Sequence, residues 1–164
     1  MTRKKKTPAA PRRIELVPLD EVQEAEVNPK RHHSDLGASI GRFGFADAPI
    51  LDERTGRLVA GHGRLGQLRA MVERGETPPE GITQDERGAW LVPLQRGWSS
   101  RSDEEAAAFL VAHNRIGEAG GWDDAQLAEL LGGLGDVEVE GLGFLDGEVQ
   151  EILDAVEPEP TADE

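Results

Sequence analysis

The sequence predicts a small α+β domain with a helical C-terminal half. Short apolar runs bounded by turn residues, the pattern of strands, occur between residues 14 and 94. After residue 102 the apolar residues recur at helical spacing instead. A length of 164 residues suits one domain, and a hydrophobic content of 37% with 4% aromatic residues allows it only a small core.

The first elements are a strand and a helix. Ile14–Val17 is a predicted strand that stops before Pro18. A helix is predicted to begin after Ser34, which can cap it, and to end at Gly44. Its predicted inward face consists of Leu36, Ile40 and Phe43.

A strand pair and a second helix follow. Ala48–Leu51 and Arg57–Ala60 are predicted to pair as a hairpin in which Gly56 supplies the turn. The next helix is predicted to follow Arg64, to end near Gly75 and to bury Leu65, Leu68 and Met71 or Val72. The rest of this half is predicted as a loop, a strand and a loop, at 76–88, Ala89–Leu94 and 97–102.

Three helices are predicted in the C-terminal half. Ser102 and Glu105 form a capping box for a helix that runs to about Arg115, and 117–121 interrupts it. Trp122 sits at the staple position before the next helix. The predicted caps of the other two helices are Asp123, with Gln126 three residues on, and Asp146. Their predicted inward residues are Leu127, Leu130, Leu131 and Leu134, then Val149, Ile152, Leu153 and Val156.

Charge is distributed unevenly along the chain. The net charge of −14 argues against a surface that binds nucleic acid all over. The first 13 residues are basic without an acid, through Arg3, Lys4, Lys5, Lys6, Arg12 and Arg13. We therefore predict a disordered basic tail, a domain, a helical extension and an acidic tail, at 1–13, 14–135, 136–156 and 157–164. The basic tail is either a solubility tail or a contact to nucleic-acid phosphates.

Several classes of protein are excluded by what the sequence lacks. It has no cysteine, which excludes a disulfide framework, a thiolate zinc site and a cysteine nucleophile. Its basic start lacks the apolar run of a signal peptide, and no stretch approaches the ~20 apolar residues of a membrane span. We expect a cytoplasmic protein.

The stretch LVAGHGRLGQL, residues 58–68, is the first candidate site. Gly61 and Gly63 leave backbone N–H groups accessible, and the helix that follows directs its N-terminus to the same place. Arg64 adds a forked cation suited to phosphate oxygens. Together with His62, these residues form either an anion site or a plain strand-to-helix turn.

A second candidate is VAHNRIGEAGGWDD, residues 111–124. His113, Asn114, Arg115 and Glu118 cluster at the end of a helix. They form either an ordinary helix C-terminus or a second wall of a phosphate site, with Arg115 for charge, Asn114 for a metal or phosphate oxygen, and Glu118 as acid, base or ligand.

Other polar and aromatic groups favour structural roles. A zinc site on the four histidines lacks support, because His32 and His33 are adjacent and would diverge, and His62 and His113 add no ligand spacing. Three serines in the loop before residue 103 are better caps than nucleophiles: Ser99, Ser100 and Ser102. The three tryptophans suit core or staple positions: Trp90, Trp98 and Trp122.

The order of these segments resembles the N-terminal domain of the ParB/sulfiredoxin superfamily over about residues 14–135. The matching segments are VNPKRHH, LGASIGRFGFADAPILDE, GRLVAGHGRL, LVPL and SDEEAAAFLVAHNRIGEAGGWD. The likeness is greatest to the short ParB-like "nuclease" domains of phages and of proteins linked to DNA methyltransferases. It implies an α+β fold with a small mixed sheet that binds a nucleotide, CTP in ParB and ATP in sulfiredoxin, with Mg²⁺, and it implies association with DNA.

The resemblance transfers some site residues and not others. In the ParB loop G-E-R-R, Gly61 and Arg64 match, whereas His62 replaces the acid and Gly63 the first arginine. The sulfiredoxin cysteine corresponds to His62, which excludes that activity. In the ParB motif E-N-x-x-R, Asn114 matches and Arg115 is only an approximate substitute for the arginine.

Two functions from different classes follow. In the first, the chain binds a nucleotide or a nucleic-acid phosphate through Gly61–Arg64, Asn114 and Arg115. Any reaction is metal-assisted hydrolysis of an NTP or of DNA. Asn114 would then contact the metal, and His62 or Glu118 would act as acid or base. In the second, the fold is kept as a non-catalytic module that docks DNA or a protein such as a methyltransferase. A small-molecule kinase is a third alternative.

Overall fold

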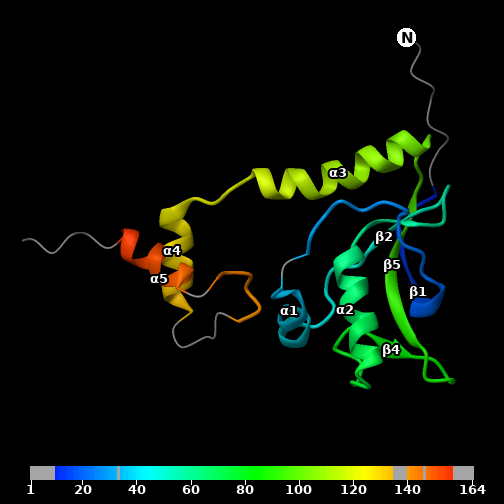
Figure 1. Cartoon of the computed structure of the whole chain (residues 1–164), viewed down its shortest axis with the longest axis horizontal. Coiled ribbons are helices and arrows are strands. Elements are labelled where there is room, and N and C mark those ends of the chain that lie inside the picture. The colour runs from blue at the N-terminus through cyan, green and yellow to red at the C-terminus, as the bar shows by residue number, and fades with distance from the viewer. Residues whose placement is uncertain (1–9, 33, 135–139, 146, 157–164) are drawn as a thin grey trace, which may run out of the picture.

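The computed structural model describes residues 10–32, 34–134, 140–145 and 147–156, and its centre is a mixed β-sheet (Figure 1). The strand order is β1–β5–β2–β3, and β4 pairs with β5 outside this path. Strand β5 runs parallel to β2 and antiparallel to β1 and β4, and β2 and β3 are antiparallel. The strands span Arg13–Pro18 (β1), Ile50–Asp52 (β2), Leu58–Ala60 (β3), Thr83–Gln84 (β4) and Trp90–Trp98 (β5).

In the part of the chain that the structure describes, five α-helices accompany the sheet. Figure 1 shows α2 between α1 and the strands, α3 leading away from the end of β5, and α4 with α5 beyond the far end of α3. Their bounds are Leu36–Phe43 (α1), His62–Glu73 (α2), Asp103–Ala119 (α3), Asp124–Gly133 (α4) and Glu148–Val156 (α5), and a 3-10 turn, η1, spans Leu19–Glu21. The predicted α+β class is confirmed. Within the described residues, no helix is long and apolar enough to cross a membrane.

The core lies between the sheet and α2. Alternate residues of β5 face it, which is why this strand buries Trp90, Val92 and Leu94. Helix α2 covers them with Leu65, Leu68 and Met71, the spacing predicted for its inward face. Because α2 begins where β3 ends, this packing fixes the α2 N-terminus at one edge of the core.

Some element boundaries differ from the prediction. Helix α1 has Asp35 rather than Ser34 at its N-cap position, and the Asp35 carboxylate accepts the Gly143 N–H (2.8 Å). Strand β5 continues to Trp98, because β1 pairs with it up to Arg96 and Asp52 of β2 pairs with Trp98. Residues 83–84, predicted as loop, form β4 by pairing with the start of β5. Helix α3 continues past Arg115 to Ala119.

Several predicted core residues are exposed. Phe43 and Trp122 are 51% and 73% exposed, so Trp122 forms no buried staple with Leu127. In the two C-terminal helices Leu127 and Leu131 are buried, whereas Leu130 and Val156 are not. These helices pack on each other rather than on the sheet. Each apolar helix face is therefore covered by one neighbouring helix only, and part of it stays exposed. The predicted cap Asp146 lies outside the described residues.

Candidate functional site

A pocket of about 170 Å³ lies where the N-terminus of α2 meets the second half of α3. Three regions distant in sequence contribute to it: α1 with the residues on either side of it, the β3–α2 turn, and α3. Its lining residues are His32, Leu36, Asp47, Gly61, His62, Gly63, Arg64, His113 and Asn114. The structure thus brings the two predicted candidate segments to one place.

The turn between β3 and α2 requires glycine at position 61. Gly61 has φ +91°, in the left-handed region, and a Cβ there would lie 2.6 Å from Pro49 Cβ. This residue is the N-cap of α2, and Leu65 N donates to its carbonyl (3.1 Å). The first N–H groups of an α-helix have no intrahelical acceptor and carry a partial positive charge, so the turn presents a donor set suited to an anion.

Arg64 supplies the cation of this wall. Its Nε lies 3.5 Å from Oδ2 of Asp47, and its side chain is 27% exposed whereas that of Asp47 is 71% exposed. An ion pair of this length between partly solvated groups contributes little free energy. Arg64 can therefore exchange the Asp47 carboxylate for another anion at low cost.

His62 is buried and uses one ring nitrogen within the protein. Its Nε2 accepts the Ala25 N–H at 3.1 Å, which ties the chain before α1 to the start of α2. Burial lowers the pKa of His62; the Glu24 carboxylate raises it and the neighbouring His32 lowers it further. The imidazole is therefore neutral near pH 7, with its proton on Nδ1.

Helix α3 contributes His113 and Asn114. The amide nitrogen of Asn114 donates to the Leu110 carbonyl (2.8 Å), which orients the side chain. His113 packs against Phe109, with ring centroids 5.7 Å apart, and Phe109 packs against Trp98 at 4.4 Å. An aromatic chain thus connects the pocket to the end of β5.

Arg115 and Glu118 are not among the residues that line the pocket. Glu118 pairs with Lys30, which lowers the pKa of its carboxyl group, and lies 4.0 Å from Arg115. The Glu118–Lys30 pair therefore connects α3 to the segment before α1, whereas the Arg115–Glu118 contact lies within α3. Of the predicted set, Gly61, His62, Gly63, Arg64 and Asn114 converge.

Two polar lining residues, Asp47 and His32, were not predicted for this site. Asp47 had no motif to mark it, and it reaches Arg64 only through the turn of the chain after α1. His32 was considered only as a metal ligand. Among the described residues no group of three or more His, Asp or Glu side chains could hold a metal ion, and His33 lies outside them.

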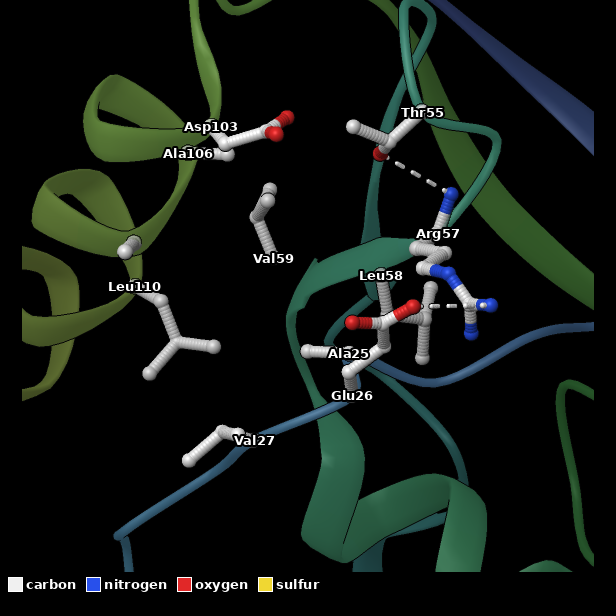
Figure 2. Close-up of a pocket in the computed structure, with 11 residues that line it drawn as sticks. Ala25, Glu26, Val27, Thr55, Arg57, Leu58, Val59, Asp103, Ala106 and Leu110 are labelled. Carbon is white, nitrogen blue, oxygen red and sulfur yellow. Dashed lines mark hydrogen bonds and ion pairs between the residues drawn. The ribbon is translucent and has the colours of Figure 1, made fainter.

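A second cavity, of about 300 Å³, separates α3 from β3 (Figure 2). Val59 and Leu110 form apolar walls, and the charged groups at its edge are Asp103 and the pair Glu26–Arg57 (3.6 Å). Arg57 Nη1 is also bonded to the Glu24 carbonyl (2.9 Å). Because two acids, Glu26 and Asp103, line this cavity and Arg57 is also bonded to a backbone carbonyl, the cavity does not suit a phosphate.

The fold and the pocket define a small α+β domain with a polar pocket at the N-terminus of α2. Its fold is ParB-like. It is similar to a crystal structure of the C-terminally truncated chromosome-partitioning protein ParB from Caulobacter crescentus complexed with CTP-γ-S, with a TM-score of 0.57, 16% identity, and coverage of 92% of this chain and 81% of that chain. No protein-family model matches the sequence, and no curated protein matches it.

Proposed function

We propose that this protein binds the phosphates of a ribonucleoside triphosphate, CTP or ATP, at the N-terminus of α2, and that it associates with DNA. The observation that carries this proposal is the pocket that joins the Gly61–Arg64 turn to Asn114. Further support comes from the ParB-like fold, because the similar ParB structure is a complex with CTP-γ-S.

Each group of pocket residues would have its own role in phosphate binding. Backbone N–H groups of the α2 N-terminus would donate to phosphate oxygens, and Arg64 would leave Asp47 to form a charge-assisted bond. His62, held by Ala25, would keep the turn in place. Asn114 would donate or accept from the α3 side.

The donor set also fits Mg²⁺ carried by the nucleotide. Mg²⁺ is commonly held by one or two protein oxygens together with substrate phosphates. Asp47 and Asn114 line the pocket and supply one carboxylate and one amide oxygen. Bound there, the ion would neutralise phosphate charge and support NTP or DNA hydrolysis.

A non-catalytic role is the second candidate. Both predicted acid–base groups already have partners, since His62 Nε2 accepts the Ala25 N–H and Glu118 pairs with Lys30. Such a module would keep the fold and bind DNA, or a protein such as a methyltransferase, in the cytoplasm of a bacterial or phage-infected cell. Phosphate release from CTP, ATP or GTP would exclude this candidate.

Calorimetric titration with CTP, ATP and GTP, each with Mg²⁺, tests the binding proposal. We expect one of them to bind. Arg64→Ala should raise the Kd of that nucleotide by about 10- to 100-fold, because a hydrogen bond to a charged group contributes ~1.5–3 kcal/mol. Arg87→Ala, an exposed arginine in the β4–β5 turn, is the matched control and should bind as the wild type does. Absence of heat with all three nucleotides would overturn the proposal.

A further inference from the structure

The imidazole of His32 occupies the space beside the second residue of α2. A Cβ built on Gly63 would lie 2.4 Å from His32 Nδ1 and 2.6 Å from its Cγ, well inside van der Waals contact. His32 belongs to the segment before α1, so the ring reaches α2 from a part of the chain 31 positions away. The ring and a side chain at position 63 cannot occupy this place together.

This close approach is specific to one glycine of α2. Gly66 lies one turn further along the same helix, and a Cβ there would meet nothing within 4 Å. Glycine weakens a helix at either position, but only at Gly63 does the missing side chain admit another residue. Because Gly63 is in the first turn, the admitted ring lies beside the exposed N–H groups of α2.

The surroundings of His32 are those of a ligand contact. It lines the same pocket as Arg64, His62, His113 and Asp47. The segment that carries it is held at two points before His32: the Ala25 N–H donates to His62 of α2, and Lys30 pairs with Glu118 of α3. An imidazole ring donates one or two N–H bonds, according to its protonation.

We propose that His32 is a phosphate-binding residue of this pocket, which supplies from the N-terminal segment the donor that position 63 lacks. With Arg64 it forms a two-sided clamp, one donor on α2 and one from the segment before α1. The inference rests on the proposed function, and it adds a residue that neither the sequence motifs nor the fold assigns to the site.

Substitutions at positions 32 and 63 test the clamp. We expect His32→Ala to weaken nucleotide binding about tenfold. Gly63→Ala should weaken nucleotide binding to the same extent although the imidazole is kept, because the added methyl group displaces the ring toward solvent. The double variant should bind no more weakly than either single variant. Gly66→Ala adds the same methyl group on the same helix without a clash, and should bind as the wild type does.

A gain-of-function variant separates ligand contact from packing. Gly63→Arg in the His32→Ala background places a donor in the vacated space and should restore Kd to within about threefold of the wild type. The inference would be overturned if Gly63→Ala bound the nucleotide as the wild type does, or if the double variant lost affinity by the product of the two single losses. If the wild type binds and Arg64→Ala weakens it while His32→Ala does not, only this inference fails; if the wild type binds no nucleotide, the proposed function itself fails.

Discussion

One buried imidazole, His62, connects the stability of the fold to pH. Its pKa in the folded protein lies below the ordinary value of 6.5 because it is buried. Below pH 6.5 the unfolded chain therefore binds more protons at this residue than the folded chain does, so the free energy of unfolding falls as the pH falls toward the folded pKa. Below that lower value the effect of His62 no longer grows.

Denaturant unfolding at pH 7.5, 6.5 and 5.5 measures this dependence. We expect the loss of stability at pH 5.5 to be smaller in His62→Gln, which cannot titrate but keeps an acceptor for the Ala25 N–H. His113→Gln, at an exposed position of the same pocket, is the control and should behave as the wild type. Glu53 does not contribute over this range, since its pKa, lowered by the bound Arg96, is about 2. An unchanged pH profile in His62→Gln would contradict the argument.

At the scale of elements, α3 is anchored by a buried carboxylate at its start. Asp52, fully buried at the end of β2, accepts hydrogen bonds from Ser100 N (2.8 Å) and Ser100 Oγ (2.6 Å), and from Arg54 N and Thr55 Oγ1 (3.1 Å each). Burial alone would raise the pKa of Asp52, but these hydrogen bonds outweigh it and lower the pKa. Ser100 lies just before α3, so this cluster sets where the helix leaves the sheet.

We expect Asp52→Ala to lower the free energy of unfolding by about 3 kcal/mol, because it leaves buried donors without an acceptor. Asp103→Asn changes an acid whose side chain is 86% exposed at the start of α3, and should cost less than ~1 kcal/mol. Urea unfolding gives both values. Trp98, 4.4 Å from Phe109 of α3, should also change its fluorescence in Asp52→Ala alone if the helix has moved. Equal stabilities of the two variants would contradict the anchor.

The elements that local patterns describe were predictable, and those made by distant pairing were not. Leu65, Leu68 and Met71 recur at helical spacing and pack in the core as expected. Strand β4 has two exposed residues and exists only through its pairing with β5, so its own residues carry no signal. The same reason separates the site residues: Gly61 and Arg64 share one motif, whereas His32 reaches Gly63 only after the chain has folded.

At the scale of the whole molecule, a basic N-terminal end is separated from an acidic remainder of the chain. Net charge is −14, yet four cations, Arg3, Lys4, Lys5 and Lys6, precede the described residues. Two arginines near the sheet are ion-paired, Arg96 with Glu53 (2.8 Å) and Arg54 with Asp103 (2.6 Å). An acidic body with paired arginines offers little to a polyanion, so DNA binding by this chain would depend on its first residues.

Replacing Arg3, Lys4, Lys5 and Lys6 with serine tests this dependence without shortening the chain. If each cation neutralises one phosphate, the slope of log K against log salt should become shallower by about 3–4, since each contact contributes ~0.9. Fluorescence anisotropy with duplex DNA between 50 and 200 mM salt measures the slope. Nucleotide affinity should not change, because the proposed phosphate contacts come from α2, α3 and the segment before α1. An unchanged slope would instead assign DNA binding to the acidic body, against its net charge.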